Sequence, residues 1–311
     1  MIYISEEESA ALVTHELAYA AVRSALVAVI GEEARIFPAV LGRAATATNT
    51  FSIKSGSAPH LTGVKVGSFW AKNPERGLPR HNSTILLLDQ YIGRLRAVVE
   101  AGTVNAYRTA AADAVAADLL ARTDAGTLAI FGAGNQAFFE VAALSRIRPI
   151  EKVYIAARPS ARQEAFAEKI EATGLRVAIV SAEEAVSSAD IIVTATPARE
   201  PLFNADWVRR GTHIASMGSD APGKRELPTE LFFKADLFCD LPAQSVTIGD
   251  FQHIREQVSA GDLVITPIGA VIENQVAGRR SADAITVFDS SGIALQDLFI
   301  ADALIKAREL F

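Results

Sequence analysis

Apolar and polar positions follow two different patterns along the chain. Between residues 126 and 290, short apolar runs typical of buried strands alternate with longer segments that have helical spacing. The strand-like runs are TLAIF, KVYIAA, RVAIV, DIIVTAT, THIASMG, ADLFCD and ITVFD, and the helical ones include NQAFFEVAALSRI, SARQEAFAEKIEATG and SAEEAVSSA. Strands separated by helices form βαβ units, which build a parallel sheet covered on both faces. This pattern predicts an α/β fold with a Rossmann-type, doubly wound parallel sheet.

The first 110 residues show the other pattern. A helix is expected near residues 6–30, and after it come strand-like runs joined by turns: ARIFPAV, TNTFSIKSG, LTGVKVGSFW, STILLLDQ and GRLRAVVE. This succession predicts a smaller α+β domain with a mostly antiparallel sheet. We place this domain at residues 1–113, joined by a C-terminal helix at 297–311, and the Rossmann domain at residues 114–296.

Composition narrows the partners of the chain. A net charge of −6 argues against a general affinity for nucleic acid or for an anionic membrane surface. The start is acidic, and no stretch approaches the ~18 apolar residues of a membrane span. Cys239 is the single cysteine, so no internal disulfide is possible and a reducing, cytoplasmic setting fits. The five histidines are scattered without ligand spacing, so no metal site is expected. With nucleic acid and membrane surfaces disfavoured by the net charge, the partner is expected to be a small molecule.

A glycine-rich turn follows the first strand of the predicted parallel sheet. In a Gly-x-Gly-x-x-(Gly/Ala) turn, the first glycine makes the turn, the second lets the backbone approach a pyrophosphate, and the third small residue lets the helix lie close to the sheet. Gly132, Gly134 and Ala137 occupy these places, and the helix that begins at Asn135 would direct its first N–H groups toward the phosphates. The turn and its flanking strand and helix predict dinucleotide binding.

The choice of dinucleotide is less sharply indicated. An NAD site commonly has Asp or Glu at the end of the second strand, where it binds the ribose hydroxyls. Here that strand ends in AARPSARQ, so the acid is missing, and Arg158, Ser160 and Arg162 are available for a 2′-phosphate. The cofactor is therefore expected to be NAD(P)H, with NADPH slightly favoured and NADH left open.

Several motifs together resemble the ornithine cyclodeaminase and mu-crystallin family, from about residue 35 to the C-terminus. They are GVKVG, AYRTAAADAVAADLLA, GAGNQA, TATPAREPLF, SMGSDAPGKREL and FDSSGIALQDL. The resemblance implies hydride transfer between a nicotinamide and the α-carbon of an amino or imino acid. It also implies that the smaller domain binds the substrate and forms a homodimer.

The resemblance also implies roles for individual residues. An imino acid needs a clamp for its carboxylate, for which arginine is well suited, and an ammonium near the reacting carbon. By resemblance, Arg35 and Arg108 hold the carboxylate, Lys65 lies beside the imine or amine, and Asp220 exchanges a proton with the substrate nitrogen. The residues that align with cofactor-contacting motifs are Arg108, Thr109, Gly132, Gly134, Asn135, Gln136, Arg158, Thr196, Pro197, Asp289 and Gly292.

One segment departs from the family pattern. Where many relatives have Met-Pro-Ala-Tyr, this chain has FSIKSGSA, which places Lys54 on a strand that should border the substrate. If Lys54 points to solvent, it has no role in the site. If it points inward, it adds a cation beyond the carboxylate clamp and favours a substrate with a second carboxylate, such as iminosuccinate, the precursor of aspartate.

Taken together, the sequence predicts an NAD(P)H-dependent imine reductase or amino acid dehydrogenase that acts on a small imino or amino acid. Two alternatives stay open. One is an ornithine cyclodeaminase-type lyase, in which NAD⁺ acts catalytically and no net redox change occurs. The other is a non-catalytic, NADPH-bound ligand carrier, against which the presence of both Lys65 and Asp220 argues.

Overall fold

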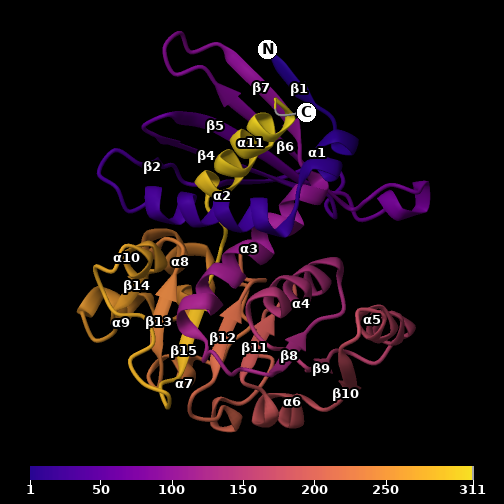
Figure 1. Ribbon diagram of the computed structural model, residues 1–311, viewed down its shortest axis with the longest axis vertical. Helices are drawn as coiled ribbons and strands as arrows, with labels where there is room; N and C mark the ends of the chain where they lie inside the picture. Colours follow the sequence, from indigo (N-terminus) through magenta and orange to yellow (C-terminus); the bar gives the residue numbers. More distant parts are fainter. Residues whose placement is uncertain (310–311) are drawn as a thin grey trace. The chain divides into compact units, whose positions relative to one another are not determined.

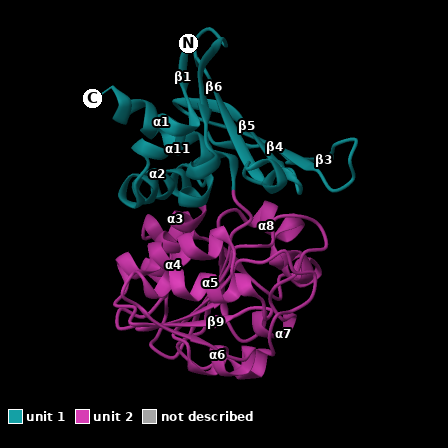
Figure 2. Cartoon of the chain, turned by 90° about the vertical axis from the view of Figure 1, so that its right-hand side faces the viewer, with its two compact units in different colours: residues 1–108, 293–311 teal, residues 109–292 magenta. Residues whose placement is uncertain are grey.

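The computed structural model describes residues 1–309 and divides into two compact units, which Figures 1 and 2 display. Unit 1 comprises Met1–Arg108 and Ile293–Phe311, and unit 2 comprises Thr109–Gly292. The sequence places these boundaries at 113/114 and 296/297, a few residues further along the chain. The last two residues of the helix expected at 297–311 lie outside the described residues.

Unit 1 contains a seven-stranded sheet. Its strands are β1 (Ile2–Ile4), β2 (Arg35–Ile36), β3 (Val40–Arg43), β4 (Thr50–Ala58), β5 (Leu61–Phe69), β6 (His81–Leu88) and β7 (Leu95–Glu100). The strand order is β1-β7-β6-β5-β4-β2, with β3 also paired to β4. All these pairs are antiparallel except β1 with β7, so the mostly antiparallel sheet expected from the sequence is confirmed.

The helices of unit 1 differ in one respect from the expectation. They are α1 (Glu6–Leu12), α2 (His15–Ala28), the short 3-10 helix η1 (Asn73–Arg76) and α11 (Ala294–Arg308). The single helix expected near residues 6–30 is two helices, because Val13 is extended (ψ 131°) and Thr14 begins a new helix. The Thr14 hydroxyl accepts a hydrogen bond from Leu17 N at 3.1 Å, which is an N-cap contact.

Helix α11 packs on the sheet of unit 1 and on α2, as Figure 1 shows in yellow. Two glycines on paired positions allow its close approach to the sheet: a Cβ on Gly56 would lie 3.4 Å from the Ala294 Cβ, and one on Gly63 would lie 2.9 Å from the Leu298 Cδ2. A Cβ on Gly63 would also lie 2.3 Å from the Leu86 carbonyl oxygen, so this position accepts glycine alone. Because side chains alternate between faces, α11 covers the face of β4 and β5 that carries these two glycines.

Unit 2 contains an eight-stranded, fully parallel sheet. Its strands are β8 (Thr127–Phe131), β9 (Lys152–Ala156), β10 (Arg176–Ile179), β11 (Ile191–Thr194), β12 (His213–Ser216), β13 (Asp236–Cys239), β14 (Ile265–Pro267) and β15 (Thr286–Asp289). The longer helices are α3 (Gly102–Leu120), within which the division between the units falls, α4 (Asn135–Ile147) and α5 (Ala161–Glu171). The shorter ones are α6 (Ala182–Ser188), α7 (Thr229–Phe232), α8 (Pro242–Ile248), α9 (Arg255–Ala260), α10 (Ile268–Ile272), and the 3-10 helices η2 (Ala205–Trp207) and η3 (Asp250–Ile254).

The strand order of this sheet, β10-β9-β8-β11-β12-β15-β13-β14, confirms the predicted doubly wound α/β fold. The chain moves outward from β8 through β9 and β10, then returns to the other side of β8 with β11. Such a reversal opens a crevice at the carboxyl ends of the strands, where ligands of open α/β sheets bind. We therefore expect the ligand-binding residues of unit 2 at the carboxyl ends of β8, β11 and β12.

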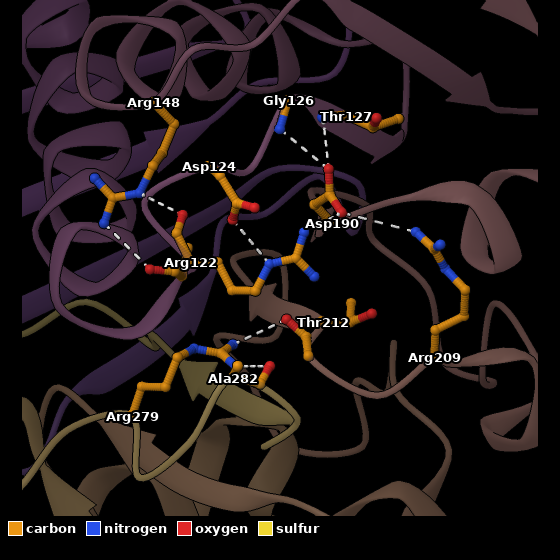
Figure 3. A network of polar contacts seen from close by, with 12 residues as sticks. Arg122, Asp124, Gly126, Thr127, Arg148, Asp190, Arg209, Thr212, Arg279 and Ala282 are labelled. Carbon is orange, nitrogen blue, oxygen red and sulfur yellow. Dashed lines mark hydrogen bonds and ion pairs between the residues drawn. The ribbon is translucent and has the colours of Figure 1, made fainter.

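The amino ends of these strands are fastened by a network of polar contacts, drawn in Figure 3. Asp190 precedes β11 and accepts hydrogen bonds from Gly126 N (3.0 Å), Thr127 N (3.1 Å) and the Arg122 guanidinium (3.0 Å). Arg148 donates to backbone carbonyl oxygens at the end of α3, including that of Ala117 at 2.9 Å. The polar groups drawn at this edge of the sheet are thus hydrogen-bonded to other residues of the same unit.

Candidate active site

Two lysines face each other across β4 and β5 in unit 1. Lys54 and Lys65 are paired in the strand register, so their side chains leave the sheet on the same face, the face that α11 covers. Both are buried, with 9% and 5% of their surface exposed. Of the two orientations that the sequence left open for Lys54, the structure shows the inward one.

Three side chains from two helices complete this group. Arg108, on α3, and Asp297, on α11, form an ion pair of 3.1 Å, and Asp297 Oδ1 also accepts a hydrogen bond from Lys65 Nζ at 2.9 Å. Asn105 lies one turn before Arg108 on α3, and its Oδ1 accepts from Lys65 Nζ at 2.5 Å and from Arg108 at 2.8 Å. We call Lys54, Lys65, Asn105, Arg108 and Asp297 the cation cluster.

The cation cluster contains three basic side chains and one carboxylate, and this imbalance shifts pKa values. Burial, followed by the charge of Arg108, lowers the pKa of Lys65 to about 7, although Asp297 opposes the shift. Burial alone would raise the pKa of Asp297, but Lys65 and Arg108 outweigh it and hold that pKa below its ordinary value. Lys65 is therefore able to exchange a proton near neutral pH, beside a carboxylate that stays ionised.

One polar atom of the cation cluster and one beside it lack hydrogen-bond partners among residues 1–309. Asp297 Oδ2 and Gln296 Nε2 are buried and make no hydrogen bond there, while Gln296 Oε1 accepts from Arg108 at 3.5 Å. A buried donor without an acceptor is costly, so Gln296 Nε2 fits a site that receives an acceptor from a ligand.

Arg35 is the predicted substrate residue that the structure leaves apart from the others. It is paired with Ser57 on β4, so it leaves the sheet on the face opposite Lys54. Its side chain is exposed and donates to the carbonyl oxygens of Glu32 (2.5 Å) and Ala34 (2.7 Å). Its guanidinium thus bonds to its own loop and not to the cation cluster.

The glycine-rich turn of unit 2 has the geometry that a dinucleotide requires. Gly132 follows β8 with φ +114°, and a Cβ there would lie 2.8 Å from the Ala195 carbonyl oxygen. Gly134 is the N-cap of α4 and provides no side-chain cap, so Asn135 and Gln136 open the helix with their backbone donors directed outward. Ala137 is fully buried against the sheet. The residues present therefore fit a bound pyrophosphate.

The arginines near the end of β9 differ in what surrounds them. Arg158 follows the strand and is exposed, and Ser160 Oγ donates to its carbonyl oxygen at 3.4 Å. Arg162, on α5, reaches the glycine-rich turn, with one guanidinium nitrogen 3.7 Å from where a Cβ on Gly134 would be. Position 157, the first after the strand, is alanine, so this strand end carries no acid.

Asp220 lies in the loop after β12, at the carboxyl edge of the sheet, as expected from the sequence. Its side chain is 54% exposed and forms an ion pair of 2.5 Å with Lys224. Asp220 belongs to unit 2, whereas the cation cluster belongs to unit 1. Thr109 follows Arg108 on α3, and Pro197 follows β11 in the loop that begins after Thr194.

Three other predicted cofactor residues use their polar groups inside unit 2. The Thr196 hydroxyl donates to Glu226 at 2.6 Å. The carboxyl of Asp289 is fully buried and accepts from Ser245 Oγ and from Asp250 N. Gly292 N donates to Asp240 at 2.8 Å. The side chains of Thr196 and Asp289 are thus turned into the fold.

Residues that sequence reasoning missed contact the predicted ones. Asn105 and Asp297 belong to the cation cluster, and Glu226 bonds to the loops at the carboxyl edge of the sheet. Asn105 had a usable signal, its spacing of three from Arg108 on a helix. Asp297 is 232 residues from Lys65, and no local pattern joins them. Among residues 1–309, no group of three or more His, Cys, Asp or Glu side chains is placed to hold a metal ion, and no helix is long and apolar enough to cross a membrane.

Comparison with known proteins adds a family and close structural relatives. The model of the ornithine cyclodeaminase/mu-crystallin family matches residues 51–308. Iminosuccinate reductase of Paracoccus denitrificans (strain Pd 1222) is 34% identical over 309 residues, covering 98% of this chain and 96% of that protein. The crystal structure of that reductase in complex with NAD⁺ matches with a TM-score of 0.91 and 33% identity, covering 100% and 97% of the two chains. An archaeal alanine dehydrogenase dimer with bound NAD matches with a TM-score of 0.91 and 30% identity, covering 100% and 96%.

Proposed function

Because this chain belongs to the ornithine cyclodeaminase/mu-crystallin family, we propose that it is an NAD(P)H-dependent reductase of an α-imino acid with two carboxylates. The proposed substrate is iminosuccinate and the product is L-aspartate. The observation that carries this choice is Lys54, buried on the same face as Lys65. The broader class, a nicotinamide-dependent oxidoreductase acting on imino or amino acids, agrees with the names of the relatives, which confirm that prediction.

The charge of the cation cluster supports a dianionic ligand. Removing cations from water costs free energy unless they are paired and hydrogen-bonded. Arg108 is proposed to clamp the carboxylate next to the imine, as its planar fork favours, and Lys54 to hold the second carboxylate. A monocarboxylate would leave the positive charge of the cluster less completely compensated.

The chain's own groups also supply the proton that reduction needs. When bound, a reduced nicotinamide would be the source of the hydride for the imine carbon. Lys65 has three N–H groups, two of which bond to Asn105 and Asp297, which leaves one to polarise the substrate. Asp220, whose side chain is 54% exposed, is proposed to serve the substrate nitrogen.

A comparison of imino acids formed in the assay tests the substrate class. Oxaloacetate with ammonium gives the dicarboxylic imine, and pyruvate with ammonium gives a monocarboxylic imine that lacks only the second carboxylate. We expect faster consumption of reduced cofactor with the oxaloacetate mixture, and no comparable rate when ammonium is omitted, since the imine and not the keto acid is the substrate. Better reduction of pyrroline-2-carboxylate than of iminosuccinate would overturn the proposal. Ammonia release from L-ornithine without net cofactor reduction would replace it with the cyclodeaminase reaction.

The finer cofactor proposal is NADPH over NADH. It rests on the absence of an acid after β9 and on the guanidinium groups of Arg158 and Arg162 near that strand end and the glycine-rich turn. Measuring kcat/KM with each reduced cofactor at saturating imine decides the question. A preference for NADH of more than about tenfold, equivalent to ~1.4 kcal/mol of transition-state discrimination, would show that this argument from charge is wrong.

The assembly proposed is a homodimer. The support is that a related archaeal alanine dehydrogenase is described as a dimer. Light scattering after size exclusion should give twice the mass of 33.1 kDa, and a monomer at assay concentration would contradict the proposal.

A further inference from the structure

Glu226 occupies an unusual position at the carboxyl edge of the parallel sheet in unit 2. It is fully buried, and its carboxylate accepts hydrogen bonds from two adjacent strands and from the loops that follow them. The donors are Thr194 Oγ1 (2.9 Å), Thr196 N (2.7 Å), Thr196 Oγ1 (2.6 Å), Ser216 Oγ (3.2 Å) and Gly218 N (2.8 Å). One carboxylate thus joins the loop after β11 to the loop after β12.

The two loops also touch directly beside Glu226. A Cβ on Gly218 would lie 2.2 Å from the Thr196 carbonyl oxygen and 2.6 Å from Glu226 Oε1, so this position accepts glycine alone. The segment that carries Glu226 is fastened to the first loop as well, because Arg225 N donates to the Ala198 carbonyl oxygen at 3.0 Å. The spacing between the loops is therefore fixed by contact and by the carboxylate together.

The surroundings of Glu226 are acidic. Asp250, on η3, accepts from the same Ser216 hydroxyl at 2.6 Å and from Glu226 N at 3.1 Å, and Asp289, at the end of β15, accepts from Asp250 N. Arg225, which precedes Glu226 in the chain, is basic, and its charge lowers the pKa of Asp250. Burial, then the charge of Asp250, raises the pKa of Glu226 to about 7, although its hydrogen bonds to Thr196 and Thr194 oppose the shift.

We propose that Glu226 is a positioning residue for the dinucleotide, and that its anionic carboxylate holds the loop of Thr196 and Pro197 against the loop of Gly218 and Asp220. This inference rests on the proposed function, which places the nicotinamide cofactor at the carboxyl edge of this sheet. Glu226 touches neither substrate nor cofactor in this proposal, because its oxygens are used by the loops. Glu226 affects the geometry of the residues that contact the cofactor.

The replacement Glu226→Gln isolates the charge while keeping the shape. The hydroxyls of Thr194 and Ser216 can turn and accept from the new amide, but a backbone N–H cannot accept. Whichever way the amide points, either Gly218 N–H or Thr196 N–H faces its NH₂ group and loses its acceptor. We expect the dissociation constants of NADH and NADPH to rise on the order of tenfold, the scale of one hydrogen bond to a charged group.

The measurement is titration of nicotinamide fluorescence at a temperature where circular dichroism shows the variant folded. The matched control is Glu230→Gln, which neutralises an exposed carboxylate four residues away on α7 and should bind as the native protein does. At saturating cofactor, the KM for the imino acid should be nearly unchanged in Glu226→Gln. A variant of lower melting temperature with native dissociation constants would show that Glu226 only supports the fold, and would overturn the inference.

The pH dependence of cofactor binding gives a second readout. Protonation of Glu226 removes a hydrogen-bond acceptor from the N–H and hydroxyl groups around it. NADH should therefore bind more weakly as the pH falls from one unit above to one unit below the pKa of Glu226. NADH suits this measurement because it has no group that titrates in this range. Asp250 and Asp289 face the same site and contribute their own steps, so Glu226→Gln should reduce this dependence and not abolish it. Affinity that is constant across this range in the native protein would also overturn the inference.

These outcomes separate the inference from the proposed function. A native protein that binds neither NADH nor NADPH contradicts the proposed function itself. A native protein that binds and reduces imines, with Glu226→Gln equal to it, contradicts only the role of Glu226.

Discussion

The two units bury opposite charges and compensate them in different ways. In unit 1, Lys54, Lys65 and Arg108 share one face with the carboxylate of Asp297, and the basic groups outnumber the acid. In unit 2, Glu226 and Asp250 are buried together and accept hydrogen bonds from hydroxyl and backbone N–H groups. Glu226 and Asp250 thus have neutral donors from their own loops, whereas the cation cluster retains an excess of positive charge and lies beside the buried Gln296 amide, whose Nε2 has no acceptor among residues 1–309. This difference is consistent with the proposed functions, in which the cation cluster binds an anionic substrate and Glu226 positions loops beside the cofactor.

Of the changes considered, removing Lys65 from the cation cluster should have the largest effect on turnover. Lys65→Ala should lower turnover by roughly 10²-fold or more, the scale of a positioned acid–base or electrostatic group, because Lys65 is the group of the cluster with a pKa near neutrality. Steady-state rates with the oxaloacetate and ammonium mixture measure the loss. Cofactor affinity should stay close to native, and Lys72→Ala, on an exposed loop lysine of the same unit, serves as the control. Near-native turnover in Lys65→Ala would remove this lysine from the mechanism.

The second cation should affect specificity more than overall activity. Lys54→Met should lower kcat/KM for the dicarboxylic imine by about 2 kcal/mol, on the scale of a charge-assisted hydrogen bond, while leaving the monocarboxylic imine unchanged or improved. The physical reason is that, of the two substrate carboxylates, Lys54 is proposed to bind the second, and removing Lys54 relieves charge repulsion at Lys65. Lys72→Met is the matched control. Equal losses on both substrates would mean that Lys54 supports the fold and does not select the ligand.

Those features of the site that depend on alternation and short spacing were predictable from the sequence. The doubly wound sheet followed from alternating runs, and the dinucleotide turn followed from Gly132 and Gly134. Lys54 was left with two orientations, because a shift of one residue in register exchanges the faces of a strand. Its pairing with Lys65 decided between them. Arg35 failed to join the cluster for the same reason, since its pairing with Ser57 sends it to the opposite face.

Features that depend on distant pairing or on side-chain direction were not predictable. Asp297 reaches Lys65 because α11 crosses the sheet near two glycines, and that placement exists only in the folded chain. The resemblance marked Thr196 and Asp289 as cofactor residues, but it carries no information on rotamers, and both side chains turn inward. The burial of Glu226 was not predictable either, because an acidic residue in a polar loop motif is ordinarily expected to be exposed.

The pH dependence of stability also distinguishes the two units, because their buried groups contribute with opposite signs. The pKa of Glu226 is raised from 4.5 to about 7 and that of Asp250 from 3.8 to about 6, so the folded protein binds more protons than the unfolded chain between these values. Their stabilising contribution is present below pH 4.5 and 3.8 respectively and is lost as the pH rises through about 7 and about 6. Lys65, with its pKa lowered from 10.5 to about 7, contributes in the opposite direction, because its stability is present above 10.5 and is lost as the pH falls through about 7.

These signs give a test by thermal unfolding across pH. In Glu226→Gln the group no longer titrates, so the melting temperature should change less between pH 4.5 and 7 than in the native protein. The difference in that change should be about 2–4 °C for each kcal/mol of linked free energy if unit 2, which carries Glu226, unfolds as one unit. Glu230→Gln, whose carboxylate is exposed, should follow the native curve. Parallel curves for Glu226→Gln and the native protein would mean that Glu226 has the same proton affinity in the folded and unfolded chains. The opposite pH dependences of the two units would then fail on the acidic side, because Glu226 would make no pH-dependent contribution to stability.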